Sequence, residues 1–479
     1  MNDPRLDHSV FGLYDKTPEM SAMRTLTLSQ KVGLAATGVA IGGALLLNPI
    51  VTLVTLNAAG TAAYIVVLIY NLLIFDRLLG QAPVVTISDE EARAYPDALL
   101  PRYTVMVAAY AEAGVIARAI RNLEALEYPQ EKLEILILLE EDDVETYEAA
   151  MACNPGPRVE IVRVPYAKPR TKPKACNYGL TLGCGDLVTI YDAEDRPETL
   201  QLRRAAIAFS RLDPSIICLQ ARLQYHNVDQ NLLTRWFAAE YVTWFAGMLP
   251  ALVALKAPIP LGGTSMHVKR EPLEAVGAWD PHNVTEDADL GMRLHRLGYR
   301  TMVLDSYTFE EANSDFINWV KQRSRWYKGY LQTWLVHARH PVQLYRELGF
   351  AGFVGFNVLV GATPILALLN PLFWLLAVLW FAGHIDLIQA IFPAWLYYPA
   401  MISLILGNFV AFYRTLLMVR TGGYPRLALA VTLSPLYWVM MSIAALRAIL
   451  QLLINPWHWE KTMHGLDQPA APTGEPVGA

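Results

Sequence analysis

Long uncharged stretches alternate with charged ones along this chain. No Asp, Glu, Lys or Arg occurs in four segments: 32–75, 348–383, 387–413 and 427–446. A helix needs about 20 apolar residues to cross a bilayer, so the first two segments are each long enough for two crossings and the other two for one crossing each. The pattern therefore predicts six membrane spans, and it excludes a short cleaved signal peptide.

Turn residues and charges place these spans more closely. Asn48-Pro49 divides the first segment, and the six spans are expected near 32–48, 51–75, 350–368, 371–390, 394–413 and 427–453. An even number of spans puts both termini in the cytoplasm. It also puts Arg414, Arg420 and Arg426 outside, against the rule that positive charges stay in the cytoplasm.

The charged segments complete the organisation. Residues 84–345 have ordinary charge and the length of one α/β domain. We expect a cytoplasmic N-terminal tail (1–31), a transmembrane hairpin (32–77), a cytosolic domain that includes an interfacial helix (84–345), four transmembrane helices (348–453) and a cytoplasmic C-terminal tail (454–479).

Within residues 84–345, short β-rich runs alternate with helical patterns. Four runs are predicted strands: 103–109, 133–139, 159–164 and 187–191. The intervals leave room for a crossover helix between successive strands, so the economical fold is a mostly parallel sheet with helices on both faces. Ligands of such folds bind beyond the carboxyl ends of the strands.

Acidic residues follow three of these strands. Glu112 comes after the first strand, the run 140–143 after the second, and Asp192-Ala-Glu194-Asp195 after the fourth. Several carboxylates at one strand end repel each other, and a hard divalent cation between them relieves that repulsion. Capping of the helix that follows is the alternative interpretation.

Composition and motifs argue against a nucleic-acid-binding protein and against an ATP-driven pump. Of 479 residues, 54% are hydrophobic and 17% are charged, against roughly 25% charged in soluble domains. The net charge of −5 argues against a nucleic-acid-binding surface. No Gly-x-x-x-x-Gly-Lys-Ser/Thr loop occurs, which disfavours an ATP-driven pump. The four cysteines lack metal-binding spacing and are expected to be reduced thiols.

Two groups of residues suit a nucleoside diphosphate. Lys172 and Lys174 precede a helix expected from about residue 175, where they would meet a phosphate at the helix N-terminus or form a solvated basic loop. Tyr110 and Glu112, after the first strand, could flank a base or ribose or belong to an ordinary surface loop.

Two further motifs suit sugar chemistry. The Thr-Glu-Asp element at 285–287 begins a helix next to Trp279, and desolvation there would raise the pKa of a carboxyl as a general base requires, with N-capping as the alternative. On a helix over 316–337, the Gln-x-x-Arg-Trp element at 322–326 presents an amide, a guanidinium and an indole on one face. That face suits the binding of a diphosphate and a sugar. The alternative is that it belongs to an interfacial amphipathic helix.

In this order, the motifs resemble the processive family-two glycosyltransferases of the cellulose synthase superfamily. The resemblance covers about residues 102–465, and the elements at 285–287 and 322–326 carry it. It implies a Rossmann-like glycosyltransferase A-type α/β domain inserted between transmembrane helices, a nucleotide-sugar donor, and Mg²⁺ or Mn²⁺.

The resemblance also implies a role for individual residues. Catalysis would fall to Asp287, as the base, and Glu286. The nucleotide sugar would contact Tyr110, Glu112, Asp142, Asp143, Lys172, Asp192 and Arg325. The acceptor would contact Thr285, His267, Gln322 and Trp326. The metal would contact Asp192 with Glu194 or Asp195.

Two departures from the family pattern stand out. Glu194 occupies the second acidic position of the usual Asp-x-Asp motif, with Asp195 directly after it, and the loop at 107–112 lacks the family's Pro and Asn. The identity of the second metal ligand and the nucleotide contacts of the first loop therefore stay open.

The expected activity is inverting transfer from a UDP-hexose or UDP-N-acetylhexosamine to a growing polysaccharide, coupled to its export with envelope partners. The alternative is single transfer to a polyprenyl or other lipid acceptor; a nucleotide-binding transporter or receptor is a rival of another class. A multi-pass protein of a bacterial-type inner membrane, with a cytoplasmic catalytic domain, is expected in either case. Aromatic and amide side chains that could line an export pore are Trp374, Trp380, Asn357 and Asn408.

Overall fold

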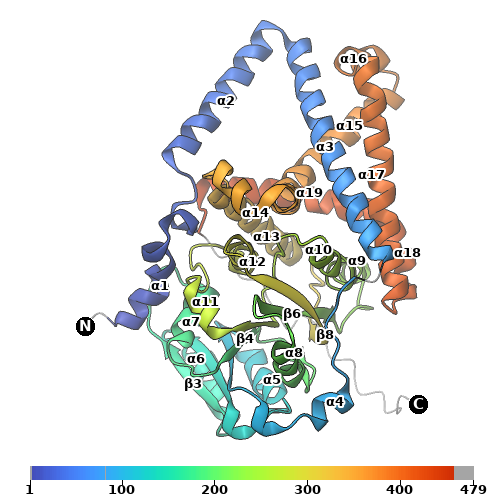
Figure 1. The fold of residues 1–479 in the computed structure, drawn as a ribbon. Helices are drawn as coiled ribbons and strands as arrows, with labels where there is room; N and C mark the ends of the chain where they lie inside the picture. The colour runs from blue at the N-terminus through green and yellow to red at the C-terminus, as the bar shows by residue number, and fades with distance from the viewer. Residues whose placement is uncertain (1–2, 81, 458–479) are drawn as a thin grey trace.

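An eight-stranded mixed sheet forms the centre of the charged segment (Figure 1). The computed structural model describes residues 3–80 and 82–457, so most of the predicted C-terminal tail lies outside the described residues. In spatial order the strands are β3 (Val159–Val164), β2 (Leu133–Glu140), β1 (Tyr103–Ala109), β4 (Leu187–Tyr191), β7 (Met266–Lys269), β6 (Ile216–Tyr225), β8 (Arg300–Glu310) and β5 (Arg196–Pro197).

The first four strands pair in parallel, as the sequence predicts. β7 runs antiparallel between β4 and β6, and β6 pairs in parallel with β8. Because β1, β2 and β4 point the same way, the acidic residues that follow them gather at one edge of the sheet.

Helices cover both faces of the sheet, because its central strands are apolar on both sides. One face packs on α5 (Ala113–Glu124), α6 (Val144–Ala152) and α8 (Gln201–Arg211). The other face packs on α7 (Lys172–Leu180), α10 (Leu249–Ala254), α11 (Arg270–Ala275) and α12 (Glu286–Arg296). Successive residues of β1 point to opposite faces of the sheet, so Val105 packs in one core and Met106 in the other.

A layer of helices separates this α/β part from the apolar helices above it (Figure 1). It contains α9 (Leu232–Tyr241), a π-helical turn (Val242–Met248), α13 (Phe316–His337) and α14 (Pro341–Phe356). The predicted helix over 316–337 coincides with α13. Segment 232–254 is apolar enough to span a membrane, but 72% of its most apolar window is buried inside the protein.

The N-terminal residues are folded onto the α/β part. They form α1 (Pro4–Lys16) and two short 3-10 helices (Pro18–Met20 and Ala22–Arg24). Asn177 Nδ2 on α7 donates to the Ser9 carbonyl over 3.2 Å, and Lys16 Nζ donates to the Ala275 carbonyl over 2.6 Å. The segment expected as a polar tail therefore packs against α7 and α11.

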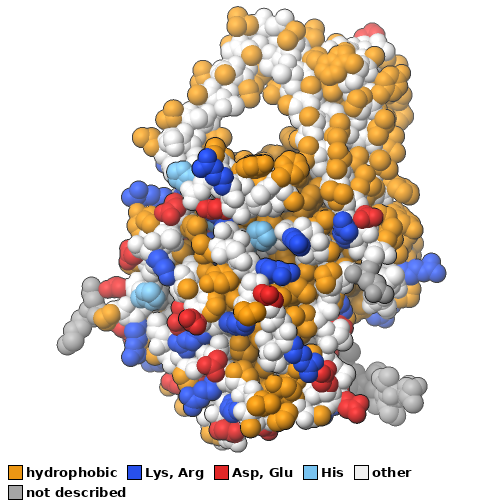
Figure 2. All heavy atoms as spheres, viewed as in Figure 1, with side chains coloured by type: hydrophobic (Ala, Val, Ile, Leu, Met, Phe, Trp, Pro, Cys, Tyr) orange, Lys and Arg blue, Asp and Glu red, His pale blue; other side chains and the backbone are white. Residues whose placement is uncertain are grey.

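Long apolar helices rise from the opposite side of this layer (Figure 1). They are α2 (Leu28–Leu47), α3 (Pro49–Leu79), α15 (Thr363–Phe381) and α17 (Ala394–Thr421), with the short α16 (Ile385–Ile391) at their far end. Figure 2 shows hydrophobic side chains covering α3 and α17, while charged side chains gather on the α/β part. This division matches the two kinds of segment in the sequence.

Six described helical segments are long and apolar enough to cross a membrane, the number expected from the sequence: Ala22–Leu47, Pro49–Leu79, Leu232–Ala254, Pro341–Phe381, Ala394–Thr421 and Ser434–Ile454. The set nevertheless differs from the expected one. Residues 341–381 continue through α14, a second π-helical turn (Asn357–Ala362) and α15 without the break expected near residues 368–371. Pro371 lies inside α15, and the non-helical residue is Gly349 (φ 64°) within α14.

Candidate active site

A cavity of about 720 Å³ lies at the carboxyl edge of the sheet, between the strand ends and the helix layer. Three groups of residues line it. The strand side contributes Tyr110, Glu112, Glu140, Arg170, Lys172, Asp192, Glu194 and Glu310. Helices α12 and α13 contribute Thr285, Glu286, Asp287, Gln322, Arg325 and Trp326. The membrane side contributes Tyr241, Trp244, Phe245, Leu359, Thr363 and Met441.

Lys172 joins the strand side to the rest of the cavity. It is the first residue of α7, and its Nζ donates to Asp192 Oδ1 and, over 2.7 Å, to the Gly263 carbonyl. Burial disfavours the ammonium, but the neighbouring carboxylates Asp192 and Glu286 raise the pKa of Lys172 overall. A permanent positive charge therefore stands among the acids, where a diphosphate would lie.

Asp192 and Glu194 face the cavity, whereas Asp195 turns inward. Asp195 is 2% exposed, and its Oδ2 accepts hydrogen bonds from Thr264 Oγ1 and from the Asp192 backbone N–H. Burial, followed by repulsion from Asp192 and Glu194, raises the pKa of Asp195. Asp195 thus shapes the turn that presents the other two acids.

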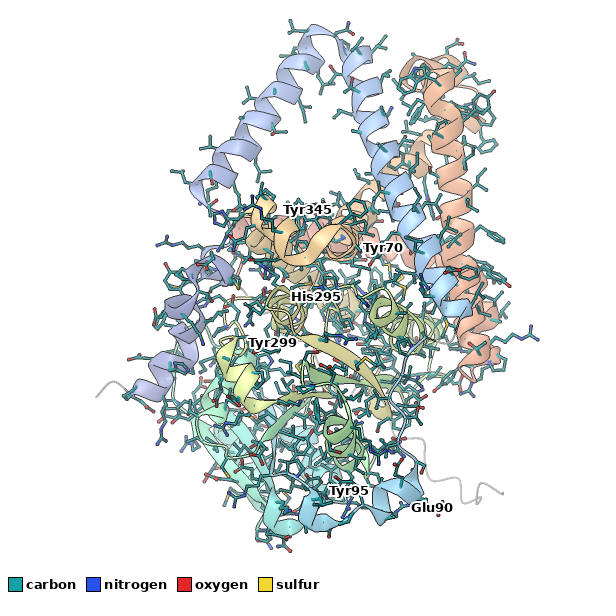
Figure 3. All side chains as sticks on the ribbon, in the orientation of Figure 1. Tyr70, Glu90, Tyr95, His295, Tyr299 and Tyr345 are labelled. Carbon is teal, nitrogen blue, oxygen red and sulfur yellow. The ribbon has the colours of Figure 1, made fainter. Side chains whose placement is uncertain are left out.

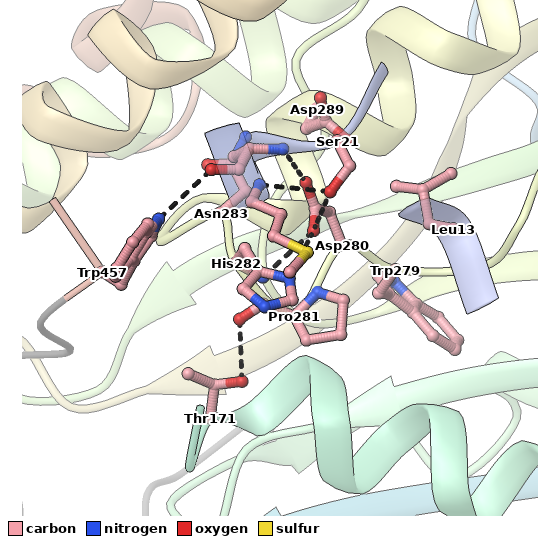
Figure 4. A network of polar contacts seen from close by, with 12 residues as sticks. Leu13, Ser21, Thr171, Trp279, Asp280, Pro281, His282, Asn283, Asp289 and Trp457 are labelled. Atoms are coloured by element: carbon pink, nitrogen blue, oxygen red, sulfur yellow. Dashed lines mark hydrogen bonds and ion pairs between the residues drawn. The ribbon is translucent and has the colours of Figure 1, made fainter. Parts of the chain in front are cut away.

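The loop before α12 is held by contacts from distant parts of the chain (Figure 4). Buried Asp280 accepts hydrogen bonds from the Ala22 backbone N–H (2.5 Å) and from Ser21 Oγ (3.3 Å). The Pro281 carbonyl accepts one from Thr171 Oγ1 over 3.1 Å. The N-terminal segment and the residue before Lys172 therefore brace the same loop.

Glu286 and Asp287 begin α12 at the cavity wall. The Thr285 backbone N–H donates to Asn283 Oδ1 over 3.0 Å, which directs the chain into the helix. Burial raises the pKa of both carboxyls above the ordinary range; repulsion from Asp287 adds to the effect on Glu286, while Lys172 and Arg325 oppose it at both positions. A carboxyl of this kind can accept a proton near neutral pH.

Helix α13 presents the Gln-x-x-Arg-Trp element to the cavity, as its helical spacing predicts. Buried Gln322 Oε1 has no hydrogen-bond partner among residues 3–80 and 82–457. The Trp326 ring stacks on Tyr241 with centroids 6.4 Å apart. The Gln322 amide is therefore available to the hydroxyls of a sugar. The Trp326 ring, with the Arg323 guanidinium 4.6 Å from its centroid, forms part of the aromatic wall of the cavity.

The far end of the strand side contains Tyr110, with the Arg170 guanidinium 4.2 Å from its ring centroid. Arg170 also forms an ion pair with Asp142. Asp143 does not line the cavity: it caps α6 and accepts hydrogen bonds from the Ala111 and Thr146 backbone N–H groups. Asp143 therefore shapes the loop rather than facing a ligand.

His267 lies away from the cavity, which corrects the expectation that it contacts an acceptor. It is fully buried on β7, with Nδ1 2.5 Å from the Tyr103 hydroxyl and Nε2 3.2 Å from Gln201 Oε1. Burial lowers the pKa of His267 to about 3. Antiparallel pairing of β7 with β4 and β6 carries His267 into the core.

Sequence reasoning missed Glu310 and the pair Glu240–Arg323. Glu310 ends β8 and lines the cavity, so the rule that located Asp192 applies to it once β8 is recognised. Glu240 accepts two hydrogen bonds from Arg323, at 2.8 and 2.6 Å, and both residues line the cavity. No local pattern links them, because they lie on different helices.

The acids of the cavity fit a divalent cation. Burial, followed by repulsion from Asp195, Asp192 and Glu194, raises the pKa of Glu310. A cation bound among these acids would relieve their repulsion. Within the described ranges, no three His, Cys, Asp or Glu side chains are arranged as a complete metal site. Asp192 and Glu194 would therefore need oxygen atoms of a ligand, such as a diphosphate, to complete the shell.

Comparison with known proteins finds a family that resembles the α/β part of the chain. Residues 101–329 match the family described as "Glycosyltransferase like family 2". This match covers just under half of the chain, and it agrees with the resemblance seen in the sequence.

Among curated relatives, the beta-monoglucosyldiacylglycerol synthase of Synechocystis sp. is 28% identical over 61% of this chain and 60% of its own length. The UDP-forming cellulose synthase catalytic subunit of Pseudomonas fluorescens is 25% identical over 48% of this chain and 31% of its own length. The chain spans 50–60% of the length of the first curated relatives that it matches.

A solved structure supports the same fold. The mannosyltransferase PcManGT from Pyrobaculum calidifontis, in complex with GDP-Man and Mn²⁺, superposes with a TM-score of 0.54 at 20% identity. The match covers 84% of this chain and 99% of that one. The expected glycosyltransferase A-type α/β fold with flanking apolar helices is confirmed.

The close contact of α12 with α13 generates a prediction. A Cβ on Gly329 would lie 2.7 Å from the Thr285 Cβ, far inside van der Waals contact. Gly329→Ala should push the helices apart and lower turnover about 100-fold, the cost of misplacing a catalytic group by about 1 Å.

Steady-state turnover and calorimetric nucleotide affinity measure this effect. Gly407→Ala, in α17 with open space around the added Cβ, is the matched control and should leave turnover unchanged. Wild-type turnover in Gly329→Ala would show that the contact is unnecessary.

Proposed function

We propose that this protein is an inverting glycosyltransferase that moves one sugar from a nucleotide sugar, a UDP-hexose or UDP-N-acetylhexosamine, to a hydroxyl group of a lipid acceptor. The observation that carries the proposal is the composition of the cavity. One space connects the buried carboxyls Glu286 and Asp287 with the apolar side chains of Leu359 and Met441 from the apolar helices. A donor entering from the strand side and a lipid entering from the membrane side would meet at α12.

Asp287 is the better placed of the two carboxyls to act as base. Its Oδ2 is directed at Gly263 across the cavity, 3.2 Å from where a Cβ on that glycine would lie. It is also less buried than Glu286. In the proposed step, the acceptor oxygen bonds to the anomeric carbon, its proton passes to Asp287, and the bond from carbon to the diphosphate oxygen breaks.

Positive side chains of the chain would receive the departing nucleoside diphosphate. Lys172 lies beside Asp192, and Arg325 faces the same space from α13. A guanidinium pairs with two phosphate oxygens at once, and groups fixed in advance stabilise developing charge strongly. Asp192 and Glu194 would hold Mg²⁺ or Mn²⁺, which when bound neutralises charge on the diphosphate.

A lipid acceptor is favoured over a polymer in an export channel. The cavity lining includes none of the side chains expected to line a pore, Trp374, Trp380, Asn357 and Asn408. Asn357 instead accepts a hydrogen bond from Trp334 Nε1 over 3.0 Å, and Asn408 Nδ2 donates to the Leu404 carbonyl of its own helix. The name of the Synechocystis relative, a glucosyldiacylglycerol synthase, points to the same class of acceptor.

Polysaccharide elongation is the second candidate. Aromatic rings in the cavity wall, those of Trp326, Tyr241 and Trp244, suit stacking on a chain of sugars. The cellulose synthase relative supports this alternative.

Removal of the proposed base tests the chemistry. Asp287→Asn should lower turnover by a factor of about 10² to 10⁴, the usual contribution of a general base, while calorimetric nucleotide affinity is retained. In the wild-type enzyme, the raised pKa of Asp287 should make kcat/KM fall on acidification at a higher pH than an ordinary aspartate would, because protonation removes the base.

Asp229→Asn is a matched control, since Asp229 is half exposed and pairs with Arg426 outside the cavity. It should keep full turnover. Full sugar transfer by Asp287→Asn would remove Asp287 from the proposed role.

Metal removal tests the acidic cluster separately. EDTA should abolish transfer and weaken binding of the nucleoside diphosphate, and added Mg²⁺ or Mn²⁺ should restore both. EDTA already saturated with Mg²⁺ is the control and should have no effect. Undiminished turnover in EDTA would show that Asp192 and Glu194 act without a metal.

Analysis of the product distinguishes the two acceptors. Incubation with a radiolabelled nucleotide sugar and lipid vesicles should give a label that extracts into organic solvent, and mass spectrometry should find one added sugar per lipid. A large, water-soluble labelled product would support elongation of a polysaccharide instead.

A further inference from the structure

Helix α19 (Ser434–Ile454) has both ends attached to the α/β part of the protein. At its start, the Tyr437 hydroxyl donates to Glu240 Oε2 on α9 over 2.7 Å. Just beyond its end, Gln332 Nε2 on α13 donates to the Pro456 carbonyl over 2.9 Å, and Trp457 Nε1 donates to the Ala22 carbonyl over 3.2 Å. A helix of 21 residues is about 32 Å long, so a spanning helix of this length would have its ends on opposite sides of the bilayer.

We propose that α19 lies in the plane of the membrane surface and that the chain crosses the bilayer four times, through α2, α3, α15 and α17. Figure 1 shows α19 running across the base of the apolar helices, beside α13 and α14. The apolar run near 427–453, which its composition assigns to a span, is then a contact surface for lipid.

The two faces of α19 support this position. Its small residues Ala444, Ala445 and Ala448 are fully buried in the core shared with α13 and α15. The opposite face is apolar and exposed over its whole length, at Leu436, Val439, Ile443, Leu446, Leu450 and Leu453. These six positions recur every three or four residues and so form a single stripe. An exposed apolar stripe of this length beside membrane helices fits the acyl chains of one leaflet.

Arg447 gives independent support. It lies in the second half of α19, near its middle, and is exposed beside the apolar stripe. In a spanning helix, this guanidinium would lie near the centre of the bilayer, which is strongly unfavourable. In a helix that lies along the surface, its long side chain reaches the lipid headgroups.

Helix α14 occupies the same layer. Arg296 on α12 forms an ion pair with Glu347 at 2.6 Å, and Leu344 and Leu348 are buried in the domain core. Tyr345 is exposed at this level (Figure 3), where aromatic side chains are favoured at a bilayer surface. The membrane crossing that follows α14 therefore begins near Thr363, at the start of α15.

Four crossings remove the conflict over positive charges. Arg426 pairs with Asp229 at 2.7 Å, so the turn after α17 lies beside the catalytic domain. The far turns, at 48–49 and 382–393, contain no Lys or Arg. All the positive charge outside the crossings is then on one side, which the positive-inside rule assigns to the cytoplasm.

Depth measurements test the position of α19. In the full chain reconstituted in vesicles, with Cys153 and Cys184 replaced by Ser, nitroxide labels are placed singly at Leu436, Ile443 and Leu450. Accessibility to oxygen and to a water-soluble nickel complex reports depth. The matched control is α17, labelled at Trp395, Ile402 and Phe409, which are exposed and have the same spacing.

The three α19 labels should report one shallow depth, whereas the α17 labels should differ by about 21 Å across 14 residues. A depth gradient along α19 equal to that along α17 would overturn the proposal. These readouts do not depend on catalysis, so they stand whatever acceptor the enzyme uses.

Labelling of single cysteines tests the number of crossings. Arg426→Cys should react with a membrane-impermeant maleimide from the same side as Glu90→Cys in the catalytic domain, and Asp386→Cys from the opposite side. Reaction of Arg426→Cys together with Asp386→Cys would establish six crossings and overturn the proposal.

Discussion

The close packing of α12 on α13 is the constraint on which the active site depends. Gly329 permits this contact, because any side chain there would overlap Thr285. Further along α12, Asp289 accepts a hydrogen bond from Arg293 Nε over 2.7 Å. Asp289 Oδ1 also lies 2.9 Å from Nε2 of His337, at the end of α13. Burial works against ionisation, but Arg293 and His337 lower the pKa of Asp289 overall. A satisfied buried network of this kind keeps two helices in one relative position, so the acids of α12 face the Arg and Trp of α13.

The cavity contains both positive and negative side chains, so it suits a ligand that has groups of both charges. Lys172 stands among carboxylates that repel one another, and Asp192 and Glu194 remain on the open side. Under the proposed function, a metal-bound diphosphate would supply a cation to the acids and an anion to Lys172 and Arg325. Negative charge that developed on such a leaving group would then lie beside fixed positive groups, which stabilise it strongly in a preorganised site.

Helix α13 connects this chemistry to the membrane. Its cavity face contains Gln322, Arg325 and Trp326, and other positions contact α19 and the start of α15. Met441 of α19 also lines the cavity. Under the proposed function, an acceptor held at the lipid surface would reach Glu286 and Asp287 without leaving the membrane boundary.

Local pattern determined much of the molecule. The four predicted strands and the helix over 316–337 were recognisable because side-chain periodicity is a property of consecutive residues. Parallel strands end at one edge, so the order of strands and acids along the chain was enough to bring Glu112, Asp192 and Glu194 together. The sequence by itself therefore determined the α/β class of the domain and the main outline of its cavity.

Contacts between distant segments decided the rest. Asp195 turns inward because Thr264, far along the chain, provides its hydrogen bond, and β7 carries His267 into the core. Composition makes α19 apolar, but only its attachments to Glu240 and Gln332 set its direction relative to the other helices. Apolar composition is the same whether a helix crosses the membrane or lies along its surface, whereas hydrogen bonds at both ends of a helix define where it lies.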